Sequence, residues 1–276
     1  MSKPHSPLTD RYGEDVERLD ELAEYTRLKP LIERGSCRSF QQTEIDPQLI
    51  QLLCAAALAS PTKSDLQQRD IIVLSDPTVK SQVQQLLSDQ DWISQAPRLL
   101  VFCGNNRRQR RLHELRQRPF ANDHLDAFFN AAVDAGVALS VFVLAAESVG
   151  LGCCPISAIR NAPDAVSDLL NLPDHVFPVA GLAVGYPAAE TPTLSPRLPL
   201  TATVHQNRYQ EDDLDSVIDA YDRRREALQP YANQRAVDEF GPSEPYGWSE
   251  DKARQYALPE RQNFGQFVRA KGFRLD

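Results

Sequence analysis

The sequence lacks the residue spacings by which metal sites and nucleotide-binding folds are usually recognised. No Cys-x-x-Cys pair occurs among its five cysteines, and its five histidines follow no ligand spacing. No Gly-x-Gly-x-x-Gly follows a strand-like run, and there is no Walker motif. We therefore expect no metal site, and a bound nucleotide would need another kind of loop.

Long hydrophobic runs are also missing. The first residues contain no apolar core of the kind that a signal peptide needs. The longest apolar stretch, Val137 to Ala146, is too short to span a bilayer. The odd cysteine count, without an export signal, favours reduced thiols. We expect a cytoplasmic protein with no membrane partner.

The chain has no excess of positive charge, since its formal net charge is −8. This acidity disfavours binding to nucleic acid. One basic run exists, but no aromatic residue interleaves with it, so a solvated helix face is expected. It comprises Arg107, Arg108, Arg110, Arg111, Arg116 and Arg118.

Hydrophobic periodicity predicts an α+β protein whose sheet is flanked by helices, because strands and helices do not alternate strictly. The helix at 124–149 is apolar on nearly every face, as expected for a helix buried in the protein or against a partner. Within it, Asp134 should pair with a basic residue or cap a neighbouring segment. Helices are predicted at 14–28, 46–59, 76–87, 124–149, 163–170, 212–228 and 249–271, with breaks at Pro30 and Pro259, and strands at 70–74, 99–103, 153–156 and 177–184.

Two segments before residue 70 could bind a ligand. Arg34 to Phe40 places two guanidiniums and a hydroxyl where they can converge on an anion. Ser60 to Gln67 is a turn rich in hydroxyls that ends in an amide, and an amide can pair with a ring edge that presents both N–H and C=O. A solvated turn and a hydrophilic loop remain the alternatives.

Two later segments have similar potential. Gly150 to Asn161 contains small residues that let backbone N–H groups approach a flat ligand. Ser195 to Pro199 holds an arginine between prolines. The alternatives are a helix end that leads into a buried strand, and a linker.

The order and spacing of these segments resemble the nitroreductase family, closest to its branch of NADPH-dependent nitroreductases and flavin reductases. The AAESVGLG helix end, the IRN tripeptide, the LxLPxHVxPxxGLxxGxP strand and the PRLP loop carry the resemblance. It implies a nitroreductase-like α+β fold, a central mixed or antiparallel sheet and an intertwined homodimer. The expected parts are an N-terminal helical extension (1–30), an FMN-binding core (31–209) and a C-terminal helical extension or dimer arm (210–276).

The resemblance also implies non-covalent FMN as cofactor and NADPH as co-substrate. Arg34, Ser36 and Arg197 would hold the phosphate, and Arg38 would lie near the pyrimidine side of the ring. The other implied cofactor residues are Thr62, Gln67, Ile156, Ser157 and Ala158, and the implied substrate residues are Ser64, Gln90, Trp92, Arg160 and Arg261, of which Arg261 would grip the 2′-phosphate of NADPH.

The implied activity is transfer of hydride from NAD(P)H, through flavin N5, to a nitroaromatic, quinone or flavin by a ping-pong mechanism. No catalytic side chain is expected, because the flavin carries the chemistry. Ser157-Ala158 replaces two glycines of close relatives, Ser195 replaces a common lysine, and Asp65 puts a carboxylate near the pocket. A flavin-binding sensor or storage protein, and an FMN enzyme of different chemistry such as dehalogenation, remain alternatives.

Overall fold

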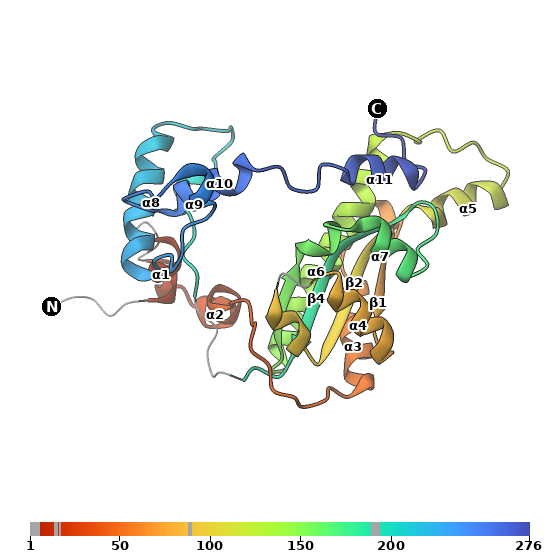
Figure 1. Cartoon of the computed structure of the whole chain (residues 1–276), viewed down its shortest axis with the longest axis horizontal. Helices are drawn as coiled ribbons and strands as arrows, with labels where there is room; N and C mark the ends of the chain where they lie inside the picture. The colour runs from red at the N-terminus through yellow and green to blue at the C-terminus, as the bar shows by residue number, and fades with distance from the viewer. Residues whose placement is uncertain (1–5, 14–15, 17, 88–89, 189–193) are drawn as a thin grey trace. The chain divides into compact units, whose positions relative to one another are not determined.

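The computed structural model describes residues 6–13, 16, 18–87, 90–188 and 194–276. The chain divides into two compact units (Figure 1). The sheet unit comprises Ser36–Thr191 and Arg261–Asp276, and the helical unit comprises Met1–Gly35 and Pro192–Glu260. We describe each unit by itself.

The sheet unit is built on four strands in the order β1-β2-β4-β3, and every neighbouring pair is antiparallel. The sheet that was predicted as mixed or antiparallel is therefore antiparallel. The strands are β1 (Arg69–Val73), β2 (Arg98–Asn105), β3 (Gly152–Ile156) and β4 (Val176–Gly185), which confirms the four predicted strands.

Alternate residues of β2 build two separate cores, because successive side chains of a strand point to opposite faces. Leu99 and Val101 pack on one face with α4 (Pro77–Gln85) and α7 (Pro163–Leu169). Leu100 and Phe102 pack on the other face with α3 (Pro47–Leu58) and α6 (Leu125–Ser148). Strand β2 is therefore apolar on both faces, and helices cover each face.

Helix α6 is the long helix that was predicted at 124–149. Its buried face is mostly alanine, which lets the helix lie close to the sheet, and Phe142 meets Phe102 edge to face with ring centroids 5.8 Å apart. By length and composition alone α6 could cross a membrane. Because α6 packs against β2 in the core, its apolar composition is that of a core helix.

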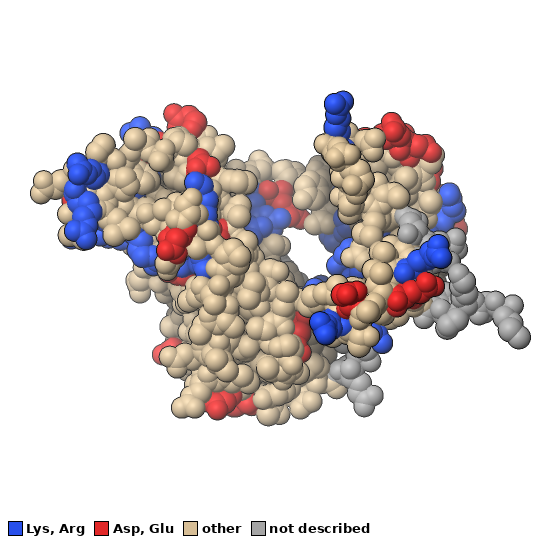
Figure 2. All heavy atoms as spheres, turned by 180° about the vertical axis from the view of Figure 1, so that it is seen from behind, with Lys and Arg blue, Asp and Glu red and all other residues tan. Residues whose placement is uncertain are grey.

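The first four arginines of the basic run lie on helix α5 (Arg107–Leu115), and Arg116 and Arg118 follow it. Figure 2 shows basic side chains gathered over this end of the sheet unit. Several of its arginines face carboxylates of the same unit. Arg108 lies 2.8 Å from Asp70, and Arg110 pairs with Asp123. These ion pairs fit a solvated helix face. The last helix, α11 (Phe264–Ala270), packs its Phe267 near Phe177 of the sheet.

The helical unit has no strand among its described residues. Its main joint is between α8 (Leu214–Leu228) and α10 (Trp248–Ala257), where the rings of Tyr221 and Trp248 meet edge to face at 5.2 Å. The end of α10 before Pro259 confirms the predicted break. The unit's other helices are α1 (Pro7–Tyr12), α2 (Tyr25–Glu33) and α9 (Val237–Phe240), with single 3-10 turns at Leu19–Glu21 and Leu200–Ala202.

The helix predicted at 14–28 is wrong, although residues 14, 15 and 17 lie outside the described part. Helix α2 begins at Tyr25 and continues through Pro30, which was expected to break it. Proline removes only one intrahelical bond, the one to the carbonyl of Thr26. No residue of α2 is buried, so water can bond that carbonyl.

Candidate functional site

Three arginines come together in the helical unit, and we call them the arginine cluster: Arg11, Arg34 and Arg197. Arg11, on α1, is only 5% exposed. Its guanidinium donates to the backbone carbonyls of Arg34 and, at 3.1 Å, Ser195. Its own carbonyl accepts from the N–H of Arg197 at 2.6 Å. The structure thus brings together two of the predicted phosphate residues and adds Arg11, which sequence reasoning missed.

The arginine cluster is electrostatically crowded. Burial lowers the pKa of Arg11, and the positive charges of Arg197 and Arg34 lower it further. The buried Nε of Arg11 has no hydrogen-bond partner among the described residues. An anion placed beside these guanidiniums would relieve the repulsion between them.

Side chains hold the loop that carries Arg197, although the loop has no regular structure of its own. The carbonyl of Pro196 accepts from the Tyr221 hydroxyl at 3.0 Å, and the carbonyl of Arg197 accepts from Arg224. A cavity of about 550 Å³ opens beside this loop, large enough for a cofactor-sized ligand. Its walls include Tyr12, Arg197, Tyr221, Arg225, Tyr231, Trp248 and Lys252.

In the sheet unit, the turn from Thr62 to Gln67 has an unusual backbone. Ser64, Asp65 and Gln67 all have positive φ, at 48°, 56° and 53°. Residues other than glycine rarely adopt positive φ, and each one that does costs free energy that contacts with its surroundings must offset. Strain of this kind concentrates at ligand sites.

Asp134 of α6 holds this turn in place. Its carboxylate, 2% exposed, accepts from the Thr62 hydroxyl and from the backbone N–H groups of Lys63 and Gln68, both at 3.0 Å. The guanidinium of Arg69, equally buried, lies 3.9 Å away. The expectation that Asp134 pairs with a basic residue or caps a neighbouring segment is confirmed.

Two of the predicted ring-binding residues, Thr62 and Gln67, belong to this turn. The side-chain amide of Gln67 donates to the Asp65 carboxylate at 3.0 Å, and the backbone N–H of Gln67 donates to the Thr62 hydroxyl. Arg38 lies over the ring of Trp92, 5.8 Å from its centroid, so two residues predicted from distant segments are neighbours. Ser36 is the first residue of the sheet unit. Gln90 directly precedes the 3-10 turn Asp91–Gln95.

The small-residue segment ends β3 and begins the 3-10 turn Ser157–Arg160. The side chain of Ile156 is 2% exposed and packs in the core. Only its backbone can therefore face a ligand. Ser157 and Ala158 follow it at the end of the strand, where close backbone approach is possible.

Two further arginines, Arg160 and Arg261, lie near each other at the other end of this 3-10 turn. Arg160 donates to the carbonyl of Val179 and lies 6.0 Å from the ring centre of Phe264. Burial lowers the pKa of Arg160, and the charge of Arg261 lowers it further. Arg261 donates to the side chain of Asn161 at 3.1 Å. The structure thus places the two predicted substrate arginines together.

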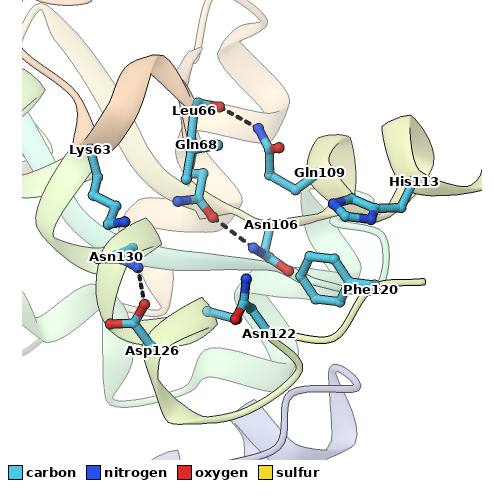
Figure 3. Close-up of a pocket in the computed structure, with 11 residues that line it drawn as sticks. Lys63, Leu66, Gln68, Asn106, Gln109, His113, Phe120, Asn122, Asp126 and Asn130 are labelled. Carbon is cyan, nitrogen blue, oxygen red and sulfur yellow. Dashed lines mark hydrogen bonds between the residues drawn. The ribbon is translucent and has the colours of Figure 1, made fainter. Parts of the chain in front are cut away.

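A small polar cavity lies behind the turn (Figure 3). Carboxamides line much of it, and the figure shows Gln68 bonded to Asn106 and Asn130 bonded to Asp126. Its volume is about 100 Å³, far below that of typical cofactor sites. It is therefore too small to hold a flavin ring.

Comparison with known proteins identifies the fold. Residues 31–186 match the model of the nitroreductase family, and residues 195–276 match the model of its C-terminal domain. The structure is similar to B. megaterium NfrA2, with a TM-score of 0.79 and 30% identity over 90% of this chain and 98% of that one. It is also similar to the NADPH:FMN oxidoreductase from Vibrio harveyi complexed with NAD+, with a TM-score of 0.76, 28% identity and 89% and 97% coverage.

Sequence relatives carry related names. The FMN reductase [NAD(P)H] of Bacillus subtilis is 33% identical, and the match covers 90% of this chain and 98% of the relative. The oxygen-insensitive NADPH nitroreductase of Salmonella typhimurium is 34% identical over 68% of this chain and 76% of the relative.

The contacts of Asp134 predict a large effect on stability. Asp134→Ala should lower the free energy of unfolding by roughly 3–5 kcal/mol, because it removes the carboxylate beside the buried Arg69 charge and leaves the Thr62 hydroxyl and two backbone N–H groups without their acceptor. Asp134→Asn, which keeps one acceptor oxygen, should lose less. Urea unfolding followed by the fluorescence of Trp92 and Trp248 measures this.

The matched control is Asp126→Ala, which removes an exposed carboxylate from the same helix. Asp126 accepts one hydrogen bond, from Asn130, so its loss should change the unfolding free energy by no more than about 1 kcal/mol. Equal effects of Asp134→Ala and Asp126→Ala would show that the buried carboxylate does not hold the turn.

Proposed function

The chain belongs to the nitroreductase family, and we propose that it is an NAD(P)H-dependent FMN oxidoreductase that prefers NADPH. The arginine cluster is the observation in the structure that best supports a phosphate-bearing cofactor. Arginine offers paired, permanently charged donors that match phosphate. A crowded set of guanidiniums with a cavity beside it suits such a group.

We assign the FMN phosphate to Arg34 and Arg197, with the hydroxyl of Ser36. Arg38, Thr62 and Gln67 contact the ring, together with the backbone N–H groups of Ile156, Ser157 and Ala158. When bound, FMN would supply the redox chemistry, which is electron transfer from NAD(P)H to an acceptor. The chain's own residues bind and orient, and their positive charges and N–H groups favour the electron-rich form of the ring.

The substrates are assigned to a second set of residues. Arg160 and Arg261 provide paired positive charge, which suits the 2′-phosphate that distinguishes NADPH from NADH. Trp92, Ser64 and Gln90 line the site that NADPH and the acceptor use in turn. The acceptors are nitroaromatics, quinones or flavins, and the carboxylate of Asp65 near Gln67 disfavours anionic ones.

One alternative draws on a contact in the structure. This alternative is a flavin-binding sensor or storage protein without turnover, for which Asp65, bonded to the Gln67 amide, and Ser195 are the supporting features. Turnover with NADPH separates the two functions. An FMN enzyme of different chemistry is separated by its products.

We also propose that the chain works as a cytoplasmic homodimer with the three parts given above. Large apolar side chains are exposed on the two helices that cover one face of the sheet. Leu52 and Leu58 of α3 and Phe129 and Val133 of α6 are 44–65% exposed. Such surfaces are typical of protein interfaces.

Sedimentation equilibrium of the FMN-loaded protein should give a mass near twice that of the chain, because burying these side chains between two copies removes apolar surface from water. A monomer that still binds FMN would contradict the dimer while leaving the activity proposal intact.

Anaerobic titration tests the activity. Addition of NADPH should bleach the visible flavin absorption of the FMN-loaded protein, and a nitroaromatic or quinone should restore it. Reciprocal plots at several NADPH concentrations should be parallel, since both substrates use one site in turn. FMN absorption that persists under excess NADPH would favour binding without turnover, and intersecting plots would contradict the ping-pong order.

Arg261→Ala tests the choice of coenzyme. It should lower kcat/KM for NADPH by about tenfold or more, since a charge-assisted contact to a phosphate is lost. The value for NADH should change little. Arg269→Ala, which removes an exposed arginine from α11, is the control. An equal loss with both coenzymes would show that Arg261 does not contact the 2′-phosphate.

A further inference from the structure

The N-terminal extension contains a residue that is built into the arginine cluster. The family model begins to match at residue 31, so Arg11 lies before it. Arg11 is nevertheless 5% exposed, whereas arginine is among the residues least often buried without a charged partner.

The bonds of Arg11 join two segments that are distant in sequence. One nitrogen of its guanidinium donates to Arg34 and another donates to Ser195, 184 residues away. The backbone bond from Arg197 to Arg11 closes the connection at 2.6 Å. Arg11 therefore fixes the backbone on which each of the two proposed phosphate residues stands.

The charge of Arg11 is not balanced by these bonds. Both guanidinium contacts are to neutral carbonyls, and within the described part of the chain no carboxylate forms an ion pair with Arg11. Its Nε is buried, and no hydrogen-bond partner for it is found in the residues that the structure describes. Burying a charge without an ion-pair partner beside two like charges costs folding free energy. A bound anion would offset that cost.

We propose that Arg11 is a positioning residue of the phosphate site: it holds Arg34 and Arg197 toward one dianionic phosphate and adds its charge to their field. The ligand class is a flavin phosphate, in preference to the uncharged riboflavin. The inference rests on the proposed function, since it takes FMN as the cofactor. It assigns a role to the residues before 31.

The cavity beside the arginine cluster gives the phosphate access. Arg197 lies in its wall, as does Tyr12, the residue that follows Arg11. Arg225 and Lys252 line the same cavity. Lys252 pairs with Asp251 at 2.6 Å, so Arg225 is the residue through which this wall adds positive charge.

Fluorescence titration of the FMN-free protein with FMN and with riboflavin tests the proposal. Arg11→Ala should raise the Kd for FMN by about tenfold or more and change the Kd for riboflavin by less than about twofold. Arg11→Lys keeps the charge but lacks the planar fork with which arginine reaches two separated carbonyls, so it should fall between Arg11→Ala and wild type. The control Arg223→Ala removes an exposed arginine from α8 of the same unit and should leave both values unchanged.

Riboflavin binding reports whether each variant is folded. If Arg11→Ala does not fold, the ratio of the two Kd values in Arg11→Lys and Arg11→Gln decides instead, and Gln should lose more FMN preference than Lys. An unchanged ratio in these variants overturns the role of Arg11. Wild-type protein that binds no FMN overturns the proposed function instead, so the two failures are distinguishable.

Discussion

Like charges repel, and this chain holds arginines close together in both of its units. In the helical unit the cost of gathering Arg11, Arg34 and Arg197 is met by backbone carbonyls and by the side chains that fasten the loop after Ser195. In the sheet unit, Arg160 and Arg261 are held by Val179 and Asn161. The neutral carbonyls orient the Arg11 guanidinium without neutralising it, so its charge can act on a bound phosphate.

One carboxylate has the opposite task. Asp134 projects from the long apolar helix α6 and accepts from the N–H of Lys63, within the turn that carries Gln67, and from the N–H of Gln68 directly after it. The turn can then keep three residues at positive φ. Because α6 also forms one core of the sheet with Phe102, the placement of the turn depends on the packing of the whole unit. Fold and site are thus joined at a single buried side chain.

Much of this organisation could be predicted from local sequence. Apolar runs located the four strands, periodicity located most helices, and the family resemblance singled out Arg34 and Arg197. Pro30 was misread because a short, exposed helix tolerates a lost bond that a buried one does not. Arg11 was missed because its partners lie 23 and 184 residues away. The bond between Asp65 and Gln67 was missed because it depends on positive φ at residues that are not glycine, so the sequence carries no signal for this turn.

The central claim is that the arginine cluster receives the phosphate of FMN. A crystal structure of the FMN-loaded protein tests it most directly. The account predicts phosphate oxygens within hydrogen-bond distance of the guanidiniums of both Arg34 and Arg197, with the two Arg11 bonds to backbone carbonyls intact. A phosphate bound by other residues, with Arg34 and Arg197 directed away from it, would contradict the account.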